Sequence, residues 1–329
     1  MKVLFIGGTG NISGAVSRMA VKLDIDLYHV NRGKRKIDIP GVKTITGSIA
    51  DKEFVDKNLS KHTWDVVVDW VAYTEEDIYR DLQIFQGKTK QFIFISSASA
   101  YQKPLTYPIV TESTPLHNPY WEYSRNKIKC EDLLMKSYRE ENFPVTIVRP
   151  SYTYDTVIPV AIGGFDEYTI ADRILKNRKI IVHGDGKSLW TLTHADDFAK
   201  GFLGLLGNIQ TIGHAFHITS DEILTWDQIY TILAEALGKA PNIVHIPSDL
   251  ICRLENSLTG ALLGDKSESV ILDNSKIKRF VPGFVATTPF KVGIKRTLEW
   301  FDTHPEYKIV KPETNAMMDR IIATYEKCL

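Results

Sequence analysis

The chain has 329 residues, and its 40 Lys and Arg residues balance its 40 Asp and Glu residues, so that the formal charge is zero. This length allows one large or two modest domains with an apolar core, and the lack of a basic excess argues against a nucleic-acid partner. No apolar run approaches the ~20 residues of a membrane-spanning helix, so we expect no membrane partner. Three widely spaced cysteines without metal-ligand spacing, Cys130, Cys252 and Cys328, indicate free thiols in a cytoplasmic protein.

The beginning of the chain combines an apolar run, a glycine-rich turn and the start of a helical pattern. Residues 3–6 (VLFI) predict a buried parallel strand, residues 7–14 (GGTGNISG) follow, and apolar residues then recur at helical spacing. Glycines let the backbone turn sharply and approach a pyrophosphate, whose charge meets the N–H groups at the helix N-terminus. This stretch predicts a dinucleotide cradle, with cofactor contacts from Gly7, Thr9, Gly10, Asn11 and Ile12.

Residues 27–30 predict a second strand, and the tip of this strand carries basic side chains. Asn31 and Arg32 follow it directly, with Lys34 and Arg35 behind them, and the nearest carboxylates precede the strand. In a dinucleotide-binding fold a carboxylate at this tip binds the free 2′-hydroxyl of the adenosine ribose, whereas an arginine suits a 2′-phosphate. We therefore predict that Asn31 and Arg32 contact the cofactor and that NADP is preferred over NAD. The alternative interpretation is a solvated basic loop.

Strands and helices continue to alternate through the first 150 residues. The run at 65–72 is nearly all apolar, as expected for a strand covered on both faces. This alternation predicts a parallel, doubly wound sheet whose ligands bind beyond the carboxyl ends of the strands. Val71 and Pro150, at two such ends, are assigned to the cofactor. Further strands are predicted at 42–45, 91–95 and 145–148, and a helix at 75–86.

The pattern changes after residue 150, where turn residues become frequent. A helix is expected to begin in 193–197, with Asp196 or Asp197 as its N-cap. We expect a dinucleotide-binding domain and a smaller substrate-binding domain. The first would comprise residues 1–150 and 188–239, and the second residues 151–187 and 240–329. Further elements are a helix near 171–176, a strand at 179–183, a helix at 226–238 and a final helix with Met318, Ile321, Ile322 and Tyr325 on one face.

Tyr123 and Lys127 stand four residues apart at the start of a predicted helix, so their side chains share one face. Lowering the pKa of a phenol from about 10 to about 7 takes roughly 4 kcal/mol, and one ammonium about 4 Å away supplies about that much at an effective dielectric of 20. Tyr123 could then exchange a proton with a substrate oxygen while hydride moves to or from a cofactor. Ser97, at the end of a predicted strand, is the third member of this group, with Ser96 and Ser99 as rivals.

The segments GGTGNIS, ISSASAY, YSRNK, RPSYTY and HGDGKSLWTLTHADDFA occur in this order along the chain. Their spacing resembles the extended short-chain dehydrogenase/reductase superfamily, the NAD(P)-dependent epimerase/dehydratase group. The resemblance implies an α/β fold, a Rossmann-type doubly wound parallel sheet with a smaller C-terminal substrate-binding domain. It also implies that Tyr123 is the acid/base, that Lys127 binds the nicotinamide ribose as well, and that Ser97 is the catalytic hydroxyl. The family commonly dimerises, which would use residues 75–86 and 123–138.

The sequence departs from this family at several positions. Ser13 replaces the third glycine of the turn, Ser48 replaces the acidic residue expected to hold adenine, and Ala98-Ser99 stands where sugar dehydratases carry Asp-Glu. Trp190 replaces an arginine that contacts a phosphate in nucleotide-sugar enzymes, and it either stacks on substrate or packs as a loop aromatic. Cations that could compensate are Lys187, Arg253 and Arg279, and the residues assigned to substrate binding are Ser99, Tyr152 and Trp190.

These features predict an NAD(P)-dependent oxidoreductase or epimerase that transfers hydride at a secondary alcohol or ketone. The substrate would be a small molecule, with sugars and sugar nucleotides among the classes considered. A dehydratase is disfavoured because no second acid/base pair is visible, and no metal site is expected: His194 with Asp196 and Asp197 is better explained by helix capping. The alternative function is a non-catalytic nucleotide-sensing or RNA-associated protein on the same fold.

Overall fold

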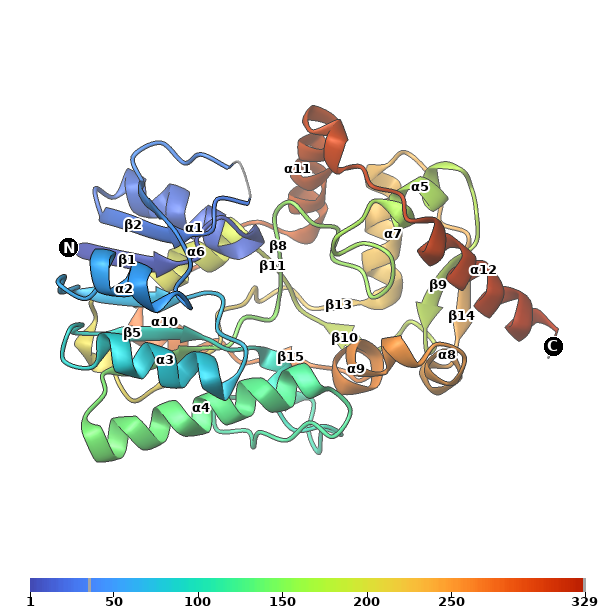
Figure 1. Cartoon of the computed structure of the whole chain (residues 1–329). Coiled ribbons are helices and arrows are strands. Elements are labelled where there is room, and N and C mark those ends of the chain that lie inside the picture. The colour runs from blue at the N-terminus through green and yellow to red at the C-terminus, as the bar shows by residue number, and fades with distance from the viewer. Residues whose placement is uncertain (35–36, 328–329) are drawn as a thin grey trace.

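The computed structural model describes residues 1–34 and 37–327, so that Arg35 of the basic tip and Cys328 lie outside the described residues. Its centre is a parallel sheet of seven strands in the order β12-β7-β5-β4-β1-β2-β3. The predicted α/β doubly wound sheet is confirmed (Figure 1). The strands are β1 (Lys2–Ile6), β2 (Asp26–Asn31), β3 (Lys43–Thr46), β4 (Val66–Asp69), β5 (Phe92–Ile95), β7 (Val145–Val148) and β12 (Ala215–Phe216).

Helices cover both faces of this sheet, and alternate strand residues feed two apolar clusters. Val3 and Phe5 of β1 belong to the cluster under α1, α6 and α10, whereas Leu4 and Ile6 belong to the cluster under α2, α3 and α4. Every strand residue of β4, β5 and β7 is buried, which explains their continuous apolar runs. The helices are α1 (Asn11–Lys22), α2 (Lys52–Asn58), α3 (Glu75–Phe85), α4 (Glu122–Glu141), α6 (Ala195–Leu203) and α10 (Ser275–Phe280).

A second lobe has its own apolar core, on the right of Figure 1. Trp226, Tyr230 and Leu233 of α7 belong to this core, although the sequence grouped 188–239 with the sheet; the division into domains stays a prediction. The helices of this lobe are α5 (Thr169–Leu175), α7 (Trp226–Ala236), α8 (Ser248–Leu254), α9 (Thr259–Ala261), α11 (Phe290–Thr303) and α12 (Pro312–Glu326). Its paired strands are β9 (Ile180–His183) with β14 (Ile243–Ile246) and β10 (Leu189–Trp190) with β13 (Leu224–Thr225).

Two short strand pairs lie where the two lobes meet. β8 (Tyr152–Tyr154) pairs with β11 (Leu192–His194), and β6 (Ile109–Val110) pairs with β15 (Ile271–Leu272), all in parallel. Figure 1 shows β8, β11 and β15 between the central sheet and α7, so several chain segments run between the two lobes at the carboxyl edge of the sheet.

Two local predictions are corrected by the structure. The predicted strand 65–72 ends at Asp69, because the Asp69 carboxylate accepts the N–H groups of Val71 (2.6 Å) and Ala72 (2.7 Å) and turns the chain. The N-cap of α6 is His194 rather than Asp196 or Asp197: its imidazole Nδ1 accepts the Asp196 N–H at 3.2 Å. The two aspartates instead occupy the first turn, where their charge suits the helix dipole.

Among residues 1–34 and 37–327, no helix combines the length and the apolar character that crossing a membrane requires.

Candidate active site

The glycine-rich turn after β1 needs two residues without side chains. Gly7 and Gly8 have φ of +94° and +116°, which L side chains rarely adopt. A Cβ on Gly8 would lie 2.5 Å from the ring of His29, a buried residue of β2. The Ser17 hydroxyl of α1 donates to the Gly8 carbonyl (3.1 Å) and lies 2.9 Å from His29 Nε2. A buried contact between Ser17 and His29 therefore stabilises the conformation of the turn.

The N-terminus of α1 faces the same turn, and the first N–H groups of a helix have no carbonyl partner within it. Gly10 is the N-cap, and the Ser13 hydroxyl accepts the Gly10 N–H at 2.9 Å, so the serine that replaces the third glycine stabilises the turn. The Asn11 side chain binds β8 and the residue that follows it: it donates to the Thr153 carbonyl (2.8 Å) and accepts the Asp155 N–H (2.9 Å). The oxygen of this amide is therefore engaged with the chain, and one of its two N–H groups is used.

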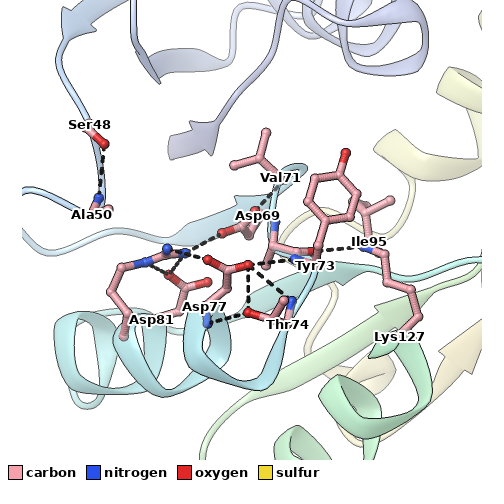
Figure 2. A network of polar contacts seen from close by, with 12 residues as sticks. Ser48, Ala50, Asp69, Val71, Tyr73, Thr74, Asp77, Asp81, Ile95 and Lys127 are labelled. Carbon is pink, nitrogen blue, oxygen red and sulfur yellow. Dashed lines mark hydrogen bonds and ion pairs between the residues drawn. The ribbon is translucent and has the colours of Figure 1, made fainter. Parts of the chain in front are cut away.

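The tip of β2 lies next to this turn, because the Gly7 N–H donates to the Val30 carbonyl at 2.9 Å. Asn31 is half-buried and its carbonyl accepts the Gly47 N–H (3.0 Å), whereas the Arg32 side chain is exposed. Ser48 follows β3 and accepts the Ala50 N–H at 3.3 Å (Figure 2). Asn31 and Arg32, predicted to lie near the ribose, and Ser48, predicted to lie near the adenine, are thus neighbours beside the glycine turn.

The loop after β4 forms the other wall. Val71 and Tyr73 are 42% and 49% exposed, which is unusual for such apolar side chains in one loop. A Cβ on Gly7 would lie 3.1 Å from Val71 Cγ1, so Val71 contacts the glycine turn. Pro150 is buried at the end of β7, and its carbonyl accepts the Ala98 N–H at 2.9 Å.

A buried pair of carboxyl groups lies next to the loop after β4 and stabilises it (Figure 2). Asp69 at the end of β4 and Asp81 in α3 are both fully buried, and Arg80 bonds Asp81 Oδ1 (2.9 Å) and Asp77 Oδ1 (2.7 Å) and lies 3.6 Å from Asp69. Burial, followed by the charge of Asp69, raises the pKa of Asp81 well above its ordinary value. The Oδ2 atoms of Asp69 and Asp81 have no hydrogen-bond donor among the described residues. A proton on the Asp81 carboxyl group would supply one donor for this pair.

Replacing Asp81 by Asn should flatten the pH dependence of stability. A carboxyl group whose pKa is raised on folding stabilises the fold fully below its unfolded pKa of about 4, and this contribution is lost as the pH rises toward the folded pKa. Asn keeps the neutral, hydrogen-bonding form at every pH. The free energy of unfolding of Asp81→Asn, measured with urea from pH 4 to pH 8, should therefore gain on wild type as the pH rises.

Asp77→Asn is the matched control for Asp81→Asn. Burial opposes ionisation of Asp77, but its carboxylate accepts the N–H groups of Tyr73 and Thr74 and pairs with Arg80, and its pKa is lowered. This variant should be less stable than wild type by an amount that is fully developed above the unfolded pKa of about 4 and then stays constant up to pH 8. Parallel pH profiles for the two variants would contradict the assignment of the proton to Asp81.

Tyr123, Lys127 and Ser97 converge at the carboxyl ends of β4 and β5. Tyr123 and Lys127 lie one turn apart near the start of α4, and the Lys127 ammonium is 5.8 Å from the Tyr123 ring. The Ser97 hydroxyl lies close enough to the Tyr123 phenol to favour its ionised form and so to lower its pKa in part. Lys127 is 2% exposed and donates to the carbonyls of Ala72 (2.6 Å) and Ile95 (2.8 Å), so it ties the β4 loop to β5 (Figure 2).

The pKa of Tyr123 is raised rather than lowered, which corrects the expectation of a phenol near pH 7. Burial is the largest cause, and the hydrogen bond from Ser97 opposes it only in part. Burial also lowers the pKa of Lys127 to about 8, and its ammonium binds two carbonyls rather than the phenol. Without a cofactor the phenol therefore keeps its proton at neutral pH, as a general acid requires.

The residues assigned to substrate binding differ in their surroundings. Ser99 is 3% exposed, and its hydroxyl bonds Ser97 (2.9 Å) and Ser124 (2.7 Å), so here it orients Ser97. Trp190 is 3% exposed, and its ring lies 5.5 Å from that of Trp226. Of its two proposed roles, these surroundings favour packing over stacking on a substrate. Tyr152 is half-buried and its phenol donates to the Val160 carbonyl at 2.7 Å.

Sequence reasoning missed several polar residues around this site. Asp69 ends an apolar strand, a visible signal, but only the fold brings it to Asp81. Lys103 and Lys266 are only 2% and 8% exposed. Neither residue belongs to a local sequence motif that would have indicated a position near Tyr123. In contrast, the exposed Lys187 and Arg253, offered as compensating cations, pair with Asp227 and Asp249, and Arg279 is exposed on α10.

Comparison with known proteins places this chain in a family. The sequence profile of the NAD dependent epimerase/dehydratase family matches residues 3–219, from β1 to just beyond β12. The chain belongs to that family. The sequence-based assignment is thereby confirmed, and because the family comprises NAD-dependent enzymes, membership supports an enzymatic role for this chain.

Individual proteins and solved structures resemble this chain at different levels. The chloroplast stem-loop binding protein of 41 kDa b from Arabidopsis thaliana is 30% identical over 74% of this chain, and the match spans 65% of that protein, just under two thirds. The 2′-dehydrokanamycin reductase of Streptomyces kanamyceticus is 24% identical over 76% of this chain and 70% of its own length. The UDP-glucuronic acid 4-epimerase from Bacillus cereus in complex with NAD shares the fold, with a TM-score of 0.73, 17% identity and coverage of 93% and 98% of the two chains.

The residues of this epimerase/dehydratase family member fit a dinucleotide. Gly7 and Gly8 leave space where a Cβ would meet Val71 or His29, the N-terminus of α1 faces the turn, and the exposed Val71 and Tyr73 offer an apolar surface beside it. These features come from two separate parts of the chain, residues 7–14 and the loop after β4, and meet at one edge of the sheet.

Proposed function

We propose that this protein transfers hydride between a nicotinamide cofactor and a secondary alcohol or ketone, with Tyr123 as the acid/base. The observation that carries this proposal is the meeting of Tyr123, Ser97 and Lys127 beside the glycine turn. When bound, the cofactor supplies the hydride or accepts it. Sugars are the substrate class that the names of several relatives suggest, and the proposal covers both a net reductase and an epimerase that oxidises and re-reduces one carbon.

The chain's own residues would divide the work. The backbone of Gly7, Gly10 and Ile12 would hold the pyrophosphate, and Lys127, at the β4 loop, would bind the nicotinamide ribose. Ser97 would hydrogen-bond the reacting oxygen, and Tyr123 would donate its phenolic proton as that oxygen becomes an alkoxide, or take it back in the oxidising direction. The raised pKa of Tyr123 supports the donor role, because the phenol stays protonated at neutral pH.

A direct test supplies a nicotinamide cofactor deuterated at its hydride-bearing carbon together with cyclic ketosugars. Mass spectrometry should find the label on a carbon of the alcohol product. An epimerase should copurify with its cofactor and return product without net oxidation, whereas a reductase should exchange cofactor freely. Failure to bind any nicotinamide dinucleotide would rule out the proposed function.

Arg32→Ala should weaken NADPH binding about 10-fold or more and leave NADH binding nearly unchanged. The exposed guanidinium at the tip of β2 can bind the 2′-phosphate, and a hydrogen bond to a charged group contributes about 1.5–3 kcal/mol. Titration of both cofactors by fluorescence measures the two affinities. Equal affinities in the wild-type protein would contradict the preference for NADP.

The 30% identity to a stem-loop binding protein favours a second candidate function, that of an RNA-associated protein on this fold. The balanced charge opposes it, since RNA binding relies on uncompensated Lys and Arg. Tight, salt-dependent binding of stem-loop RNA with no turnover of any ketone would favour this candidate. A homodimer through α3 and α4 is a further expectation of the family resemblance.

A further inference from the structure

A π-helical turn, Leu262–Lys266, packs against the segment that leads into α4. Lys103 donates to the Asp265 carbonyl (3.0 Å), and Asn118 donates to the Gly264 carbonyl (2.6 Å). A Cβ on Gly264 would lie 3.1 Å from the Cβ of Trp121, the N-cap of α4. Turns of this kind are rare and often occur at functional sites. This one contacts Trp121, which stands two residues before Tyr123 in the sequence.

The side chain of Lys266 points into an aromatic cluster beside Tyr123. Its ammonium lies 4.9 Å from the centre of the Tyr152 ring and 5.8 Å from that of Trp121, and the Trp121 and Tyr123 rings are 5.1 Å apart. The Lys266 carbonyl accepts the Trp226 indole N–H at 3.1 Å, which fixes the backbone on its other side. The Trp121 ring therefore lies between Lys266 and Tyr123, the proposed acid/base.

The ammonium of Lys266 has donors to spare. Of its three N–H groups, one binds Asp265 Oδ2 at 2.8 Å, and among the described residues no second acceptor is in hydrogen-bonding distance. The two side chains keep 10% and 16% of their surface exposed, so a ligand can reach both. The carboxylate of Asp265 also has lone pairs left for hydroxyl groups.

The charges around this turn cancel. Lys266 pairs with Asp265, and Lys103 lies 3.9 Å from Glu268, so two cations face two anions. A diphosphate brings two negative charges and needs cations that are not already neutralised. A hydroxyl group needs only one donor and one acceptor, which an ammonium–carboxylate pair offers side by side.

From this arrangement we infer that Lys266 and Asp265 bind neighbouring hydroxyl groups of an uncharged polyol ring, with the rings of Trp121 and Tyr152 beside it. The inference rests on the proposed function and specifies its substrate as a cyclic polyol ketone or alcohol without a nucleotide diphosphate. It agrees with the burial of Trp190, where the family's phosphate-binding arginine would stand.

The test compares two substrate panels with NADPH or NADH as reductant. One panel contains uncharged ring ketones, the keto forms of methyl glycosides and of cyclitols, and the other contains ketosugars linked to uridine or thymidine diphosphate. The inference expects turnover of an uncharged ketone at a kcat/KM at least equal to that of any nucleotide-linked one. Exclusive turnover of the nucleotide-linked panel would overturn it and leave the proposed function standing.

Lys266→Met should raise KM for the uncharged ketone about 10- to 100-fold, because charge-assisted hydrogen bonds are lost, and change kcat by less than about threefold. Lys266→Arg should recover most of the affinity. Lys187→Met, which removes an exposed lysine paired with Asp227, should leave both constants unchanged. An unchanged KM in Lys266→Met would overturn the inference.

Asp265→Asn serves if Lys266→Met fails to fold, which circular dichroism reveals. It retains the shape of the side chain and should raise KM in the same way, and an unchanged KM would again overturn the inference. Turnover of neither panel by wild-type protein that binds the dinucleotide would overturn the proposed function together with the inference. The two failures are thus distinguished by which panel reacts.

Discussion

Tyr123→Phe should lower turnover by about 100- to 10,000-fold, the usual contribution of a positioned general acid. The substitution removes one oxygen and leaves the ring, which packs between Tyr73 and Trp121 at 6.1 and 5.1 Å. Folding and cofactor affinity should therefore stay close to wild type, and the loss should fall on kcat. Steady-state kinetics with a ketone accepted by wild type, alongside cofactor titration, measure both quantities.

The matched control is Tyr120→Phe, which removes an exposed phenol from the same segment. It should change turnover little, because Tyr120 lies outside the Ser97–Tyr123–Lys127 group. Turnover of Tyr123→Phe at the wild-type rate would refute the assignment of the acid/base. Loss of turnover through unfolding would appear as a lowered Tm, which this isosteric change is not expected to cause.

Gly8→Ala should abolish dinucleotide binding and destabilise the fold by about 2–6 kcal/mol. At φ of +116° a Cβ is strained, at about 1–3 kcal/mol, and it would lie 2.5 Å from the ring of His29. That ring is 1% exposed and stacks on Phe5, so moving it disturbs the core at a further cost of about 1–3 kcal/mol. Urea unfolding and cofactor titration should both register the change.

Gly14→Ala is the control on the same motif. Gly14 lies inside α1, where an added Cβ would meet only an Arg18 nitrogen at 3.5 Å. Alanine is the better helix former by about 1 kcal/mol, so this variant should be as stable as wild type or more stable and should bind the dinucleotide normally. If both variants bind the dinucleotide as wild type does, the turn after β1 is not its cradle.

Local sequence was sufficient to predict the framework of the sheet. Apolar runs such as 145–148 and 91–95 became β7 and β5 with the same limits or within one residue, because strands covered on both faces must be apolar throughout. The glycine turn was predictable for a similar reason: only glycine tolerates the φ values of Gly7 and Gly8. α2 was not predicted, since among its seven residues only Val55 is buried and no periodic pattern arises.

Other properties depend on residues that are far apart in sequence. Tyr123 and Lys127 were recognisable as a pair, but the raised pKa of the phenol comes from burial, which spacing does not reveal. Asp69 meets Asp81 across two elements, and Lys266 reaches Trp121 from 145 residues further along the chain. Residue periodicity reports which face of an element is apolar, whereas desolvation and charge depend on which elements pack together. The framework of the sheet therefore follows from local patterns, whereas the proton affinities and the surroundings of the buried charges arise from long-range packing.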